Sequence, residues 1–337
     1  MSYLLKTNLS KIIGAAIAVL LFLSAFLSSL YFGQTAIVVD DIVQAFTSFN
    51  SSSINQLVIL EERLPRAVLG SVIGACLAIA GALMQALTGN PLASPSIFGI
   101  NAGALFFVVL SITLFSFTSL VQIMWMALLG ATLAGVIVFM LGSLGREGMT
   151  PVKVVLAGAA ISALFSSMTQ AMLVLDENGL QQVLFWLTGS ISGRSLDMLY
   201  PILPFIVVAV GVSMFMGNAL NVFATGEDVA KNLGQKTTLL KIAIGVIVII
   251  LAGSSVSIAG AIGFIGLVVP HITRGIFGPD HRWLIPLCAV LGASLLVSAD
   301  VVARLLIMPQ EIPVGIMTAL IGTPFFIYIA RYGLTKR

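Results

Sequence analysis

Charged residues are what this sequence has least of. Only 9% of its 337 residues are Asp, Glu, Lys or Arg, whereas a soluble domain carries about 25%. The stretch 67–145 contains no charged residue at all, and 59% of the chain is hydrophobic. Water cannot be the main solvent of such a surface, which excludes an ordinary soluble domain. Because the apolar runs are continuous rather than alternating, they predict helices and not β-barrel strands.

The sequence is also poor in the residues that build catalytic and metal sites. Its two cysteines, Cys76 and Cys288, and its two histidines, His271 and His281, are isolated from one another. We therefore expect no disulfide framework, no metal site and no bound cofactor. The motif G-x-x-x-x-G-K-[ST] is absent, so the chain is not expected to bind ATP through a P-loop. The net charge of +3 is spread along the chain, which gives no reason to expect a nucleic-acid partner.

Ten apolar runs approach the ~20 residues that a membrane-spanning helix needs. The first is too long for the core of a cleaved signal peptide, so we predict a retained span. Pro270 interrupts the eighth, which neighbouring helices can accommodate. We predict a single all-α membrane domain over residues 1–337. The predicted spans are 12–33, 66–87, 95–115, 121–144, 152–175, 199–217, 239–258, 264–280, 284–305 and 313–331.

The basic residues predict an orientation, because Lys and Arg collect in cytoplasmic loops. Eleven of them fall on one side of the predicted spans, including those near both ends of the chain. This asymmetry predicts that both termini lie in the cytoplasm. The four basic residues on the outer side need a separate explanation. They are Arg63, Arg66, Arg194 and Arg304.

A short internal similarity links the second and seventh predicted spans. Ile79–Ala82 and Ile258–Ala261 both read IAGA, and at the same offset of 179 Pro91 matches Pro270. With a shared Ile-Phe-Gly, eight of 21 positions are identical. The two spans are an odd number apart, so the copies would face opposite ways. This pattern predicts an inverted repeat of spans 2–5 and 7–10, with coincidence between two Ala/Gly-rich helices as the alternative.

A stripe of small residues runs along the second predicted span. Every fourth residue from Gly70 to Ala86 is Gly or Ala. Small residues let the backbones of neighbouring helices approach closely. We expect this span to be buried inside the bundle, by tight packing or as the wall of a path.

The predicted cytoplasmic loop 218–238 contains the signals of a short helix. Thr225 and Asp228 have the spacing of a capping box, and Gly234 is a plausible stop. We therefore expect a helix over about 227–233. It is either an ordinary connection or a docking element for a cytoplasmic partner.

A proline-rich turn, Thr88–Ser96, follows the second predicted span. Its Asn-Pro pair and second proline make a stiff break. It is expected at the cytoplasmic face, near Thr150 and Pro151 at the start of the fifth span. Such a turn could gate a path or be a plain tight turn.

Several long strings together carry a resemblance to a known family. They are similar to the permease subunits of the binding-protein-dependent importers for iron–siderophore complexes and cobalamin, over residues 10–335. The strings are RLPRAVLGSVIGACLAIAGALMQALTGNPLASPSIFGINAGA, AGAIGFIGLVVPHITR, PDHRWLIPLCAVLGASLLVSADVVAR and EIPVGIMTALIGTPFFIYI.

The resemblance implies an assembly in the cytoplasmic membrane of a bacterium. Two permease subunits of ten spans each, identical or different, would surround a central path. Two ATPase subunits would dock from the cytoplasm, and a substrate-binding protein would deliver cargo from outside. The chain itself would not be an enzyme, because ATP hydrolysis belongs to the separate subunits.

The resemblance also implies roles for individual residues. The family's outer arginines contact acidic residues of the binding protein, and Arg63, Arg66 and Arg304 match them. The family often has two small hydroxyl residues at the second gate element, where this chain has Pro151. The residues that match the cytoplasmic gate region are Asn90, Pro91, Leu92, Thr150 and Pro151. The residues that match the ATPase-coupling segment are Gly226, Glu227, Asp228, Val229, Ala230, Asn232, Leu233 and Gly234.

The string NPLASPSIFGINAGA is closer to siderophore permeases than to cobalamin permeases, so an iron–siderophore complex is the expected cargo. A cobalamin or haem permease of the same family is the alternative. A secondary carrier driven by an ion gradient is a further alternative, although few ionisable residues fall within the predicted spans. An intramembrane enzyme would need a nucleophile–base pair or a metal constellation, and the sequence shows neither.

Overall fold

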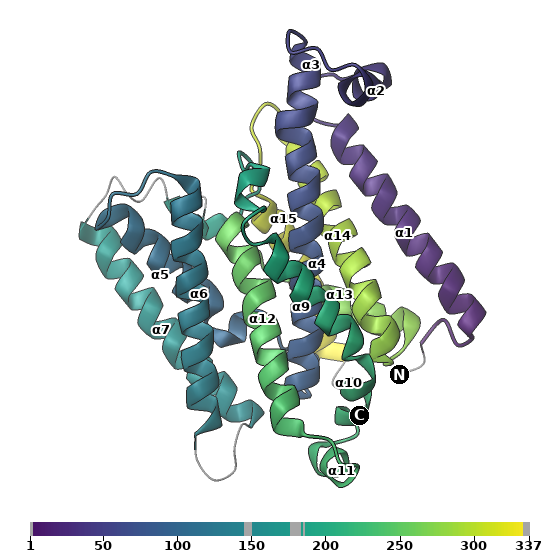
Figure 1. The fold of residues 1–337 in the computed structure, drawn as a ribbon, viewed down its shortest axis with the longest axis vertical. Helices are drawn as coiled ribbons and strands as arrows, with labels where there is room; N and C mark the ends of the chain where they lie inside the picture. Colours follow the sequence, from purple (N-terminus) through teal and green to yellow (C-terminus); the bar gives the residue numbers. More distant parts are fainter. Residues whose placement is uncertain (1–2, 145–149, 176–182, 185, 333–337) are drawn as a thin grey trace.

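A computed structural model describes residues 3–144, 150–175, 183–184 and 186–332 of the chain. Within these ranges the chain forms helices and turns and no strand (Figure 1). A π-helical stretch, Val58–Arg63, joins α3 to α4 without a break. The helices are α1 (Asn8–Tyr31), α2 (Val39–Thr47), α3 (Ile54–Leu57), α4 (Leu64–Thr88), α5 (Ile100–Thr113), α6 (Leu120–Ser143), α7 (Pro151–Leu175), α9 (Leu203–Phe215), α10 (Gly217–Phe223), α11 (Glu227–Asn232), α12 (Thr237–Ala259), α13 (Ile265–Phe277), α14 (His281–Leu305) and α15 (Val314–Tyr332).

The prediction of an all-helical membrane protein is confirmed. Among the described residues, six helices are long and apolar enough to cross a membrane: α1, α3–α4, α6, α7, α12 and α14. The bent pair α9 and α10, which meet at 56°, would make a seventh crossing. The apolar helices α5, α13 and α15 are shorter. A helix therefore lies at each of the ten predicted positions, while length and composition support six or seven crossings.

Helix α4 lies inside the bundle and packs against α12, α13 and α14. Glycines bring the backbones together at two levels. A Cβ atom on Gly74 would lie 2.3 Å from the carbonyl oxygen of Gly292 on α14, and one on Gly81 would lie 1.9 Å from that of Gly266 on α13. The small-residue stripe thus allows direct backbone contact, and the predicted burial of this helix is confirmed.

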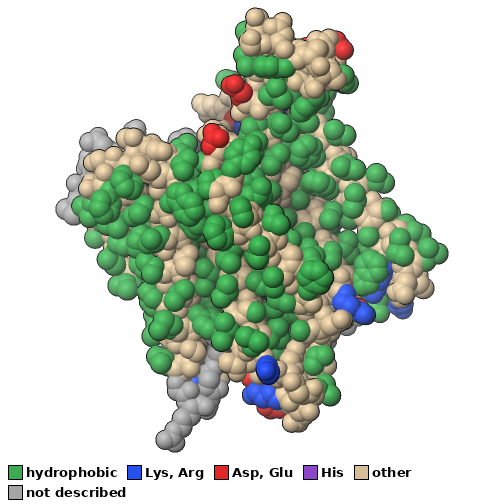
Figure 2. Space-filling model, viewed as in Figure 1, with side chains coloured by type: hydrophobic (Ala, Val, Ile, Leu, Met, Phe, Trp, Pro, Cys, Tyr) green, Lys and Arg blue, Asp and Glu red, His purple; other side chains and the backbone are tan. Residues whose placement is uncertain are grey.

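Two groups of helices flank this centre (Figure 1). Helices α5, α6 and α7 pack together at one edge, and α1 lies along α14 at the other. The short helices α2 and α3 lie at one end of the molecule and α11 at the opposite end. Figure 2 shows hydrophobic side chains along the flank, with Lys and Arg gathered toward the end that carries α11. Arg146, Lys336 and Arg337, which contributed to the predicted charge asymmetry, lie outside the described residues.

The strings that suggested an internal repeat have different local structures. Gly81 lies within α4, whereas its counterpart Gly260 ends α12 with φ of +75° and ψ of −162°, a conformation open only to glycine. Pro91 lies in a turn, but Pro270 lies inside α13. The identical residues of the two strings therefore do not occupy equivalent positions in the two helices. Helices α4 and α12 do run in opposite directions (Figure 1). The inverted repeat stays a prediction about the order and direction of the helices.

Candidate functional site

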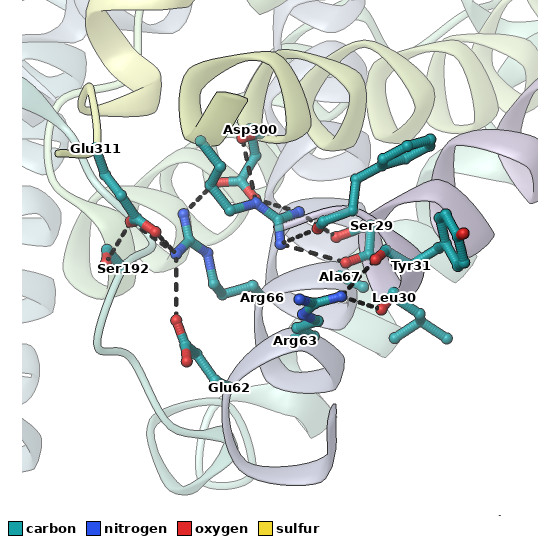
Figure 3. A network of polar contacts seen from close by, with 12 residues as sticks. Ser29, Leu30, Tyr31, Glu62, Arg63, Arg66, Ala67, Ser192, Asp300 and Glu311 are labelled. Carbon is teal, nitrogen blue, oxygen red and sulfur yellow. Dashed lines mark hydrogen bonds and ion pairs between the residues drawn. The ribbon is translucent and has the colours of Figure 1, made fainter. Parts of the chain in front are cut away.

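Three of the four outer arginines meet where α4, α14 and the end of α1 come together (Figure 3). Arg63 and Arg66 lie at the junction between the π-helical stretch and α4, and Arg304 lies in the last turn of α14. Their exposed fractions are 2%, 3% and 2%. A buried cation is costly unless it is paired and hydrogen-bonded. The partners of these side chains therefore decide what the cluster does.

Arg66 is surrounded by carboxylates. It binds Glu311 with two hydrogen bonds from Nη1, at 2.8 and 3.0 Å, and donates from Nη2 to Asp300 at 2.9 Å. Glu62 is more distant, at 3.8 Å. The second oxygen of Asp300 lies 3.1 Å from Arg304, which is four residues further along the same face of α14. Asp300 thus joins α4 to α14.

Arg63 and Arg304 bind the end of α1. Arg63 donates through Nη1 to the carbonyl oxygens of Leu30 and Tyr31, at 2.9 and 2.5 Å. Arg304 donates to the hydroxyl oxygen of Ser29 at 2.7 Å. The last carbonyls of a helix lack partners within it and carry partial negative charge. The two guanidinium groups satisfy these carbonyls and hold α1 against α4 and α14.

Glu311 connects this cluster to the segment between α14 and α15. Besides Arg66, it accepts hydrogen bonds from the Ser192 hydroxyl at 3.0 Å and from the Gln34 amide at 3.4 Å. Its side chain is 20% exposed, against 3% for Asp300. The sequence patterns did not single out Glu311 as a site residue. Its position before the last predicted span, on the same side as Arg66, was the one signal of this role.

The fourth outer arginine, Arg194, lies apart from the cluster. Its guanidinium stacks on the ring of Trp186, 4.6 Å from the ring centre. Burial lowers the pKa of Arg194 to about 10, because the charged form is disfavoured away from water. Within the described residues, the exposed charges at this end of the molecule are all acidic. They are Asp40, Glu61, Glu62 and Asp197.

The second candidate region is α11, at the opposite end. The predicted helix is present over Glu227–Asn232, and Gly234 stops it with φ of +82°. The predicted capping box is wrong. Gly226, with φ of +116°, occupies the N-cap position, while the Thr225 hydroxyl donates back to the carbonyl oxygen of Val222 at 2.7 Å. Because the Thr225 hydroxyl is bonded to the preceding helical turn, it does not cap α11 as its spacing from Asp228 had predicted.

Helix α11 is fixed to α12 by an ion pair. A carboxylate oxygen of Glu227 lies 2.7 Å from Nζ of Lys241, and the other lies 3.1 Å from Nζ of Lys231. The hydrogen bond from Lys241, followed by that from Lys231, lowers the pKa of Glu227. Ala230 lies on the inner face of α11 and is fully buried. Lys241 is a functional candidate that the sequence did not single out, since it counted only as one more cytoplasmic charge.

The outer face of α11 is apolar at two positions. Val229 is 48% exposed and Leu233 is 69% exposed. Residues four apart lie on the same face of a helix, so the two side chains form one small apolar surface beside the exposed Asp228 and Asn232. This small apolar surface makes α11 a candidate for contact with a partner.

The predicted gate residues form two adjoining structures. Helix α4 ends at Gly89, with φ of +62°, and the side chain of Asn90 then accepts a hydrogen bond from the backbone amide of Leu92 at 2.9 Å. This bond holds the Asn90–Leu92 turn, including Pro91. Pro151 is the first residue of α7, and the Thr150 hydroxyl accepts from a backbone amide of its first turn at 3.4 Å. The unusual proline thus occupies a position that favours helix initiation.

A cavity of about 250 Å³ lies where these elements meet. Its walls include Gly89 from the end of α4, Pro151 from α7, Gly226 and Glu227 from α11, and Lys241 from α12. The structure therefore brings the start of the predicted gate turn, its second element and the predicted coupling segment around one space. A movement of α11 would change the shape of this space directly.

The similarity of this chain to known proteins extends over both regions. Residues 19–332 match the FecCD transport family. The chain belongs to the FecCD transport family. One FecCD relative, the Probable siderophore transport system permease protein YfiZ of Bacillus subtilis (strain 168), is 52% identical over 97% of this chain and 98% of its own length. The Fe(3+)-citrate import system permease protein YfmD of the same organism is 44% identical over 97% of each chain.

A solved structure shows the same fold. The inward-facing structure of a metal-chelate-type ABC transporter superposes on this FecCD chain with a TM-score of 0.82 and 30% sequence identity. The match covers 93% of this chain and 97% of the other. The chain therefore shares its overall fold with a transporter of the metal-chelate ABC type.

Proposed function

We propose that this FecCD chain is the membrane-spanning permease subunit of an ATP-driven importer, and that its cargo is an iron–siderophore complex. The relatives named for siderophore and Fe(3+)-citrate transport support the cargo. The observation that carries the proposal is the shared cavity, because it connects a surface suited to a cytoplasmic partner with the elements suited to gating.

The proposed topology has ten spans, with both termini in the cytoplasm of a bacterium. The six or seven long crossings are supplemented by α5, α13 and α15, which are apolar and lie within the bundle. The end that carries α11, toward which the Lys and Arg side chains visible in Figure 2 gather, would face the cytoplasm. The end that carries α2 and α3 would face outward.

Partner subunits would cover the surfaces that this chain leaves open. Helix α7 exposes Ser166, Ser167 and Gln170 in its C-terminal half. Polar side chains on a membrane helix usually face protein or a water-filled path rather than lipid. We therefore assign this face to a central path shared with a second permease subunit. Two ATPase subunits would dock, one on the α11 of each permease, against Val229 and Leu233.

ATP hydrolysis in those subunits would move α11, and this movement would pass to the gate through a few direct contacts. A displacement of α11 passes to α12 through the ion pair between Glu227 and Lys241. Across the cavity it reaches Gly89 and Pro151, and so the Asn90–Leu92 turn. The gate closes the cytoplasmic end of the path in this proposal. The permease itself performs no chemistry.

The outer arginine cluster is the proposed docking site of the substrate-binding protein. Arg63 and Arg66 closely follow α3 in the chain, and Arg304 contacts Ser29 at the end of α1. Figure 1 shows α2 and α3 at the proposed outer end. All three are buried and paired within the chain. Docking through acidic side chains of a partner therefore requires that an internal contact be replaced.

The test is uptake in proteoliposomes that contain this chain, with the ATPase and binding protein identified from neighbouring genes. ATP-dependent entry of radioactive iron bound to a siderophore supports the proposal, and cobalamin and haem serve as competing cargoes. Uptake driven by an ion gradient without ATP would instead indicate a secondary carrier. Val229→Asp and Leu233→Asp should each abolish ATPase association, whereas Thr225→Asp adds the same charge nearby and should not.

A further inference from the structure

We propose that Glu311 occupies the binding site of a partner's carboxylate. In the free permease it pairs with Arg66, and an acidic side chain of the docking protein displaces it. Docking would thus be an exchange of carboxylates, and it would release the segment between α14 and α15. This inference rests on the proposed function and assigns a mechanism to its outer site.

The geometry of the contact is the first observation. Nη1 of Arg66 donates to both oxygens of Glu311, at 3.0 and 2.8 Å. A planar guanidinium recognises any carboxylate through short, charge-assisted bonds of this kind. An incoming Glu or Asp can reproduce them without a change in Arg66. The remaining bond from Arg66 to Asp300 at 2.9 Å would keep the guanidinium in place during the exchange.

The two carboxylates of Arg66 differ in accessibility. The side chain of Asp300 is 3% exposed and is held by Arg304 as well, while that of Glu311 is 20% exposed. Glu311 also lies outside any helix, and the five residues before it, 306–310, are all exposed. Because its backbone is not fixed by helical hydrogen bonds, Glu311 can leave Arg66 at a lower cost than Asp300.

The charge of the outer end is the second observation. Within the described residues the exposed charges there are acidic, and every outer arginine is buried. An acidic partner would therefore meet repulsion at the surface unless it gained a specific cation. Arg66 becomes available only when an internal carboxylate leaves it. The exchange explains how the buried Arg66 can serve a docking protein.

The contacts of Glu311 indicate which other segments of the chain its release would affect. Ser192, which donates to Glu311 at 3.0 Å, precedes α9. At the start of α15, the backbone amide of Gly315 donates to the carbonyl oxygen of Gly189 at 2.9 Å. The same short segment thus contacts both Glu311 and α15. Displacement of Glu311 loosens one of these two connections and transmits docking to the membrane helices.

The test compares Glu311→Gln with Glu61→Gln in the full chain, assembled with its ATPase in lipid nanodiscs. Both variants remove one negative charge from the outer end, but Glu61 is exposed and makes no ion pair with the described arginines. Affinity for the purified soluble binding protein is measured at low and high salt. We expect about fivefold tighter binding for Glu311→Gln, equivalent to about 1 kcal/mol, and a smaller gain for Glu61→Gln that salt removes.

Binding no tighter for Glu311→Gln than for Glu61→Gln overturns the exchange. A purely structural role of Glu311 would weaken binding or leave it unchanged. If the parent protein does not bind the binding protein at all, the proposed docking function fails together with the exchange. Binding of the binding protein to the parent permease therefore distinguishes a failure of the docking function from a failure of the exchange.

A second measurement does not depend on the Glu311 variant. Gln310→Cys places a thiol in the exposed segment, and the native Cys76 and Cys288 are buried and should stay unlabelled. A spin label at position 310 should become more mobile when the binding protein is added. Binding without any change in label mobility would contradict the release of this segment.

Discussion

Glu227 and Lys241 form an ion pair of 2.7 Å across the boundary between α11 and α12. The pair lies in the wall of the cavity that also contains Gly89 and Pro151. It is a direct side-chain contact between the helix proposed to meet the ATPase and a membrane helix. Its removal tests whether this connection transmits force.

Replacing Lys241 by Gln should uncouple ATP hydrolysis from transport. The variant removes the ion pair but keeps a side chain of similar length, so α11 remains folded on its buried Ala230. We expect continued ATPase activity with reduced cargo uptake in proteoliposomes. Lys236→Gln is the control, because Lys236 is exposed at the start of α12. Normal uptake per ATP in Lys241→Gln would remove the ion pair from the coupling route.

The pH dependence of coupling follows from the pKa of Glu227. Its hydrogen bond from Lys241 lowers that pKa, so the pair is complete above the ordinary Glu value of about 4.3 and is lost only as pH falls through the lowered value. Uptake per ATP should therefore be flat from pH 7 to about 5, as far as this pair decides it. Glu227→Gln should be low at every pH. A loss of coupling that is centred near pH 6 and absent from Glu227→Gln would contradict this assignment.

Asp300 should be the most sensitive position in the outer cluster. It pairs with Arg66 at 2.9 Å and with Arg304 at 3.1 Å, and Asp300→Asn leaves both buried cations with less compensation. We expect a loss of about 3 kcal/mol in the free energy of unfolding, visible as a lower thermal midpoint in detergent. Glu62→Gln, which affects an exposed acid 3.8 Å from Arg66, should change stability by less than about 0.5 kcal/mol. Equal effects of the two variants would show that burial does not decide the outcome.

Backbone contact between α4 and α13 predicts a severe effect of a single methyl group. A Cβ on Gly81 would lie 1.9 Å from the carbonyl oxygen of Gly266, so Gly81→Ala forces the helices apart. We expect a destabilisation of about 1–3 kcal/mol, measured by thermal unfolding. Gly211→Ala in α9 meets no atom within 4 Å and should be neutral or stabilising by up to about 1 kcal/mol. A neutral Gly81→Ala would mean that this contact can relax.

Much of the helix layout could be predicted from the sequence because hydrophobic length and turn residues are local signals. The second predicted span, 66–87, agrees closely with α4. The sixth, 199–217, missed the bend at Met216 where α9 meets α10 at 56°. Gly217 directly follows Met216 at that bend, and a Cβ on it would lie 3.0 Å from the Cα of Arg282. A single glycine in an apolar run does not predict a bend, and the close packing against α14 is not visible in the sequence.

The arginine cluster shows the limit of charge counting. The excess of basic residues assigns a side to Arg66, but it carries no information on whether the side chain points into water or into the protein. Its partners Asp300 and Glu311 lie more than 230 residues away in sequence. Pairing over that separation depends on the packing of α4 against α14, which one sequence does not reveal.

The contacts of Gly74 with Gly292 and of Gly81 with Gly266 also have a practical consequence. Helices that touch through their backbones have no side chains between them that could change rotamer, so α4, α13 and α14 keep constant separations. Probes attached within these three helices would provide an internal standard for distance spectroscopy. A change in the distance from such a probe to a probe on α7 or α11 could then be assigned to movement of α7 or α11 during transport.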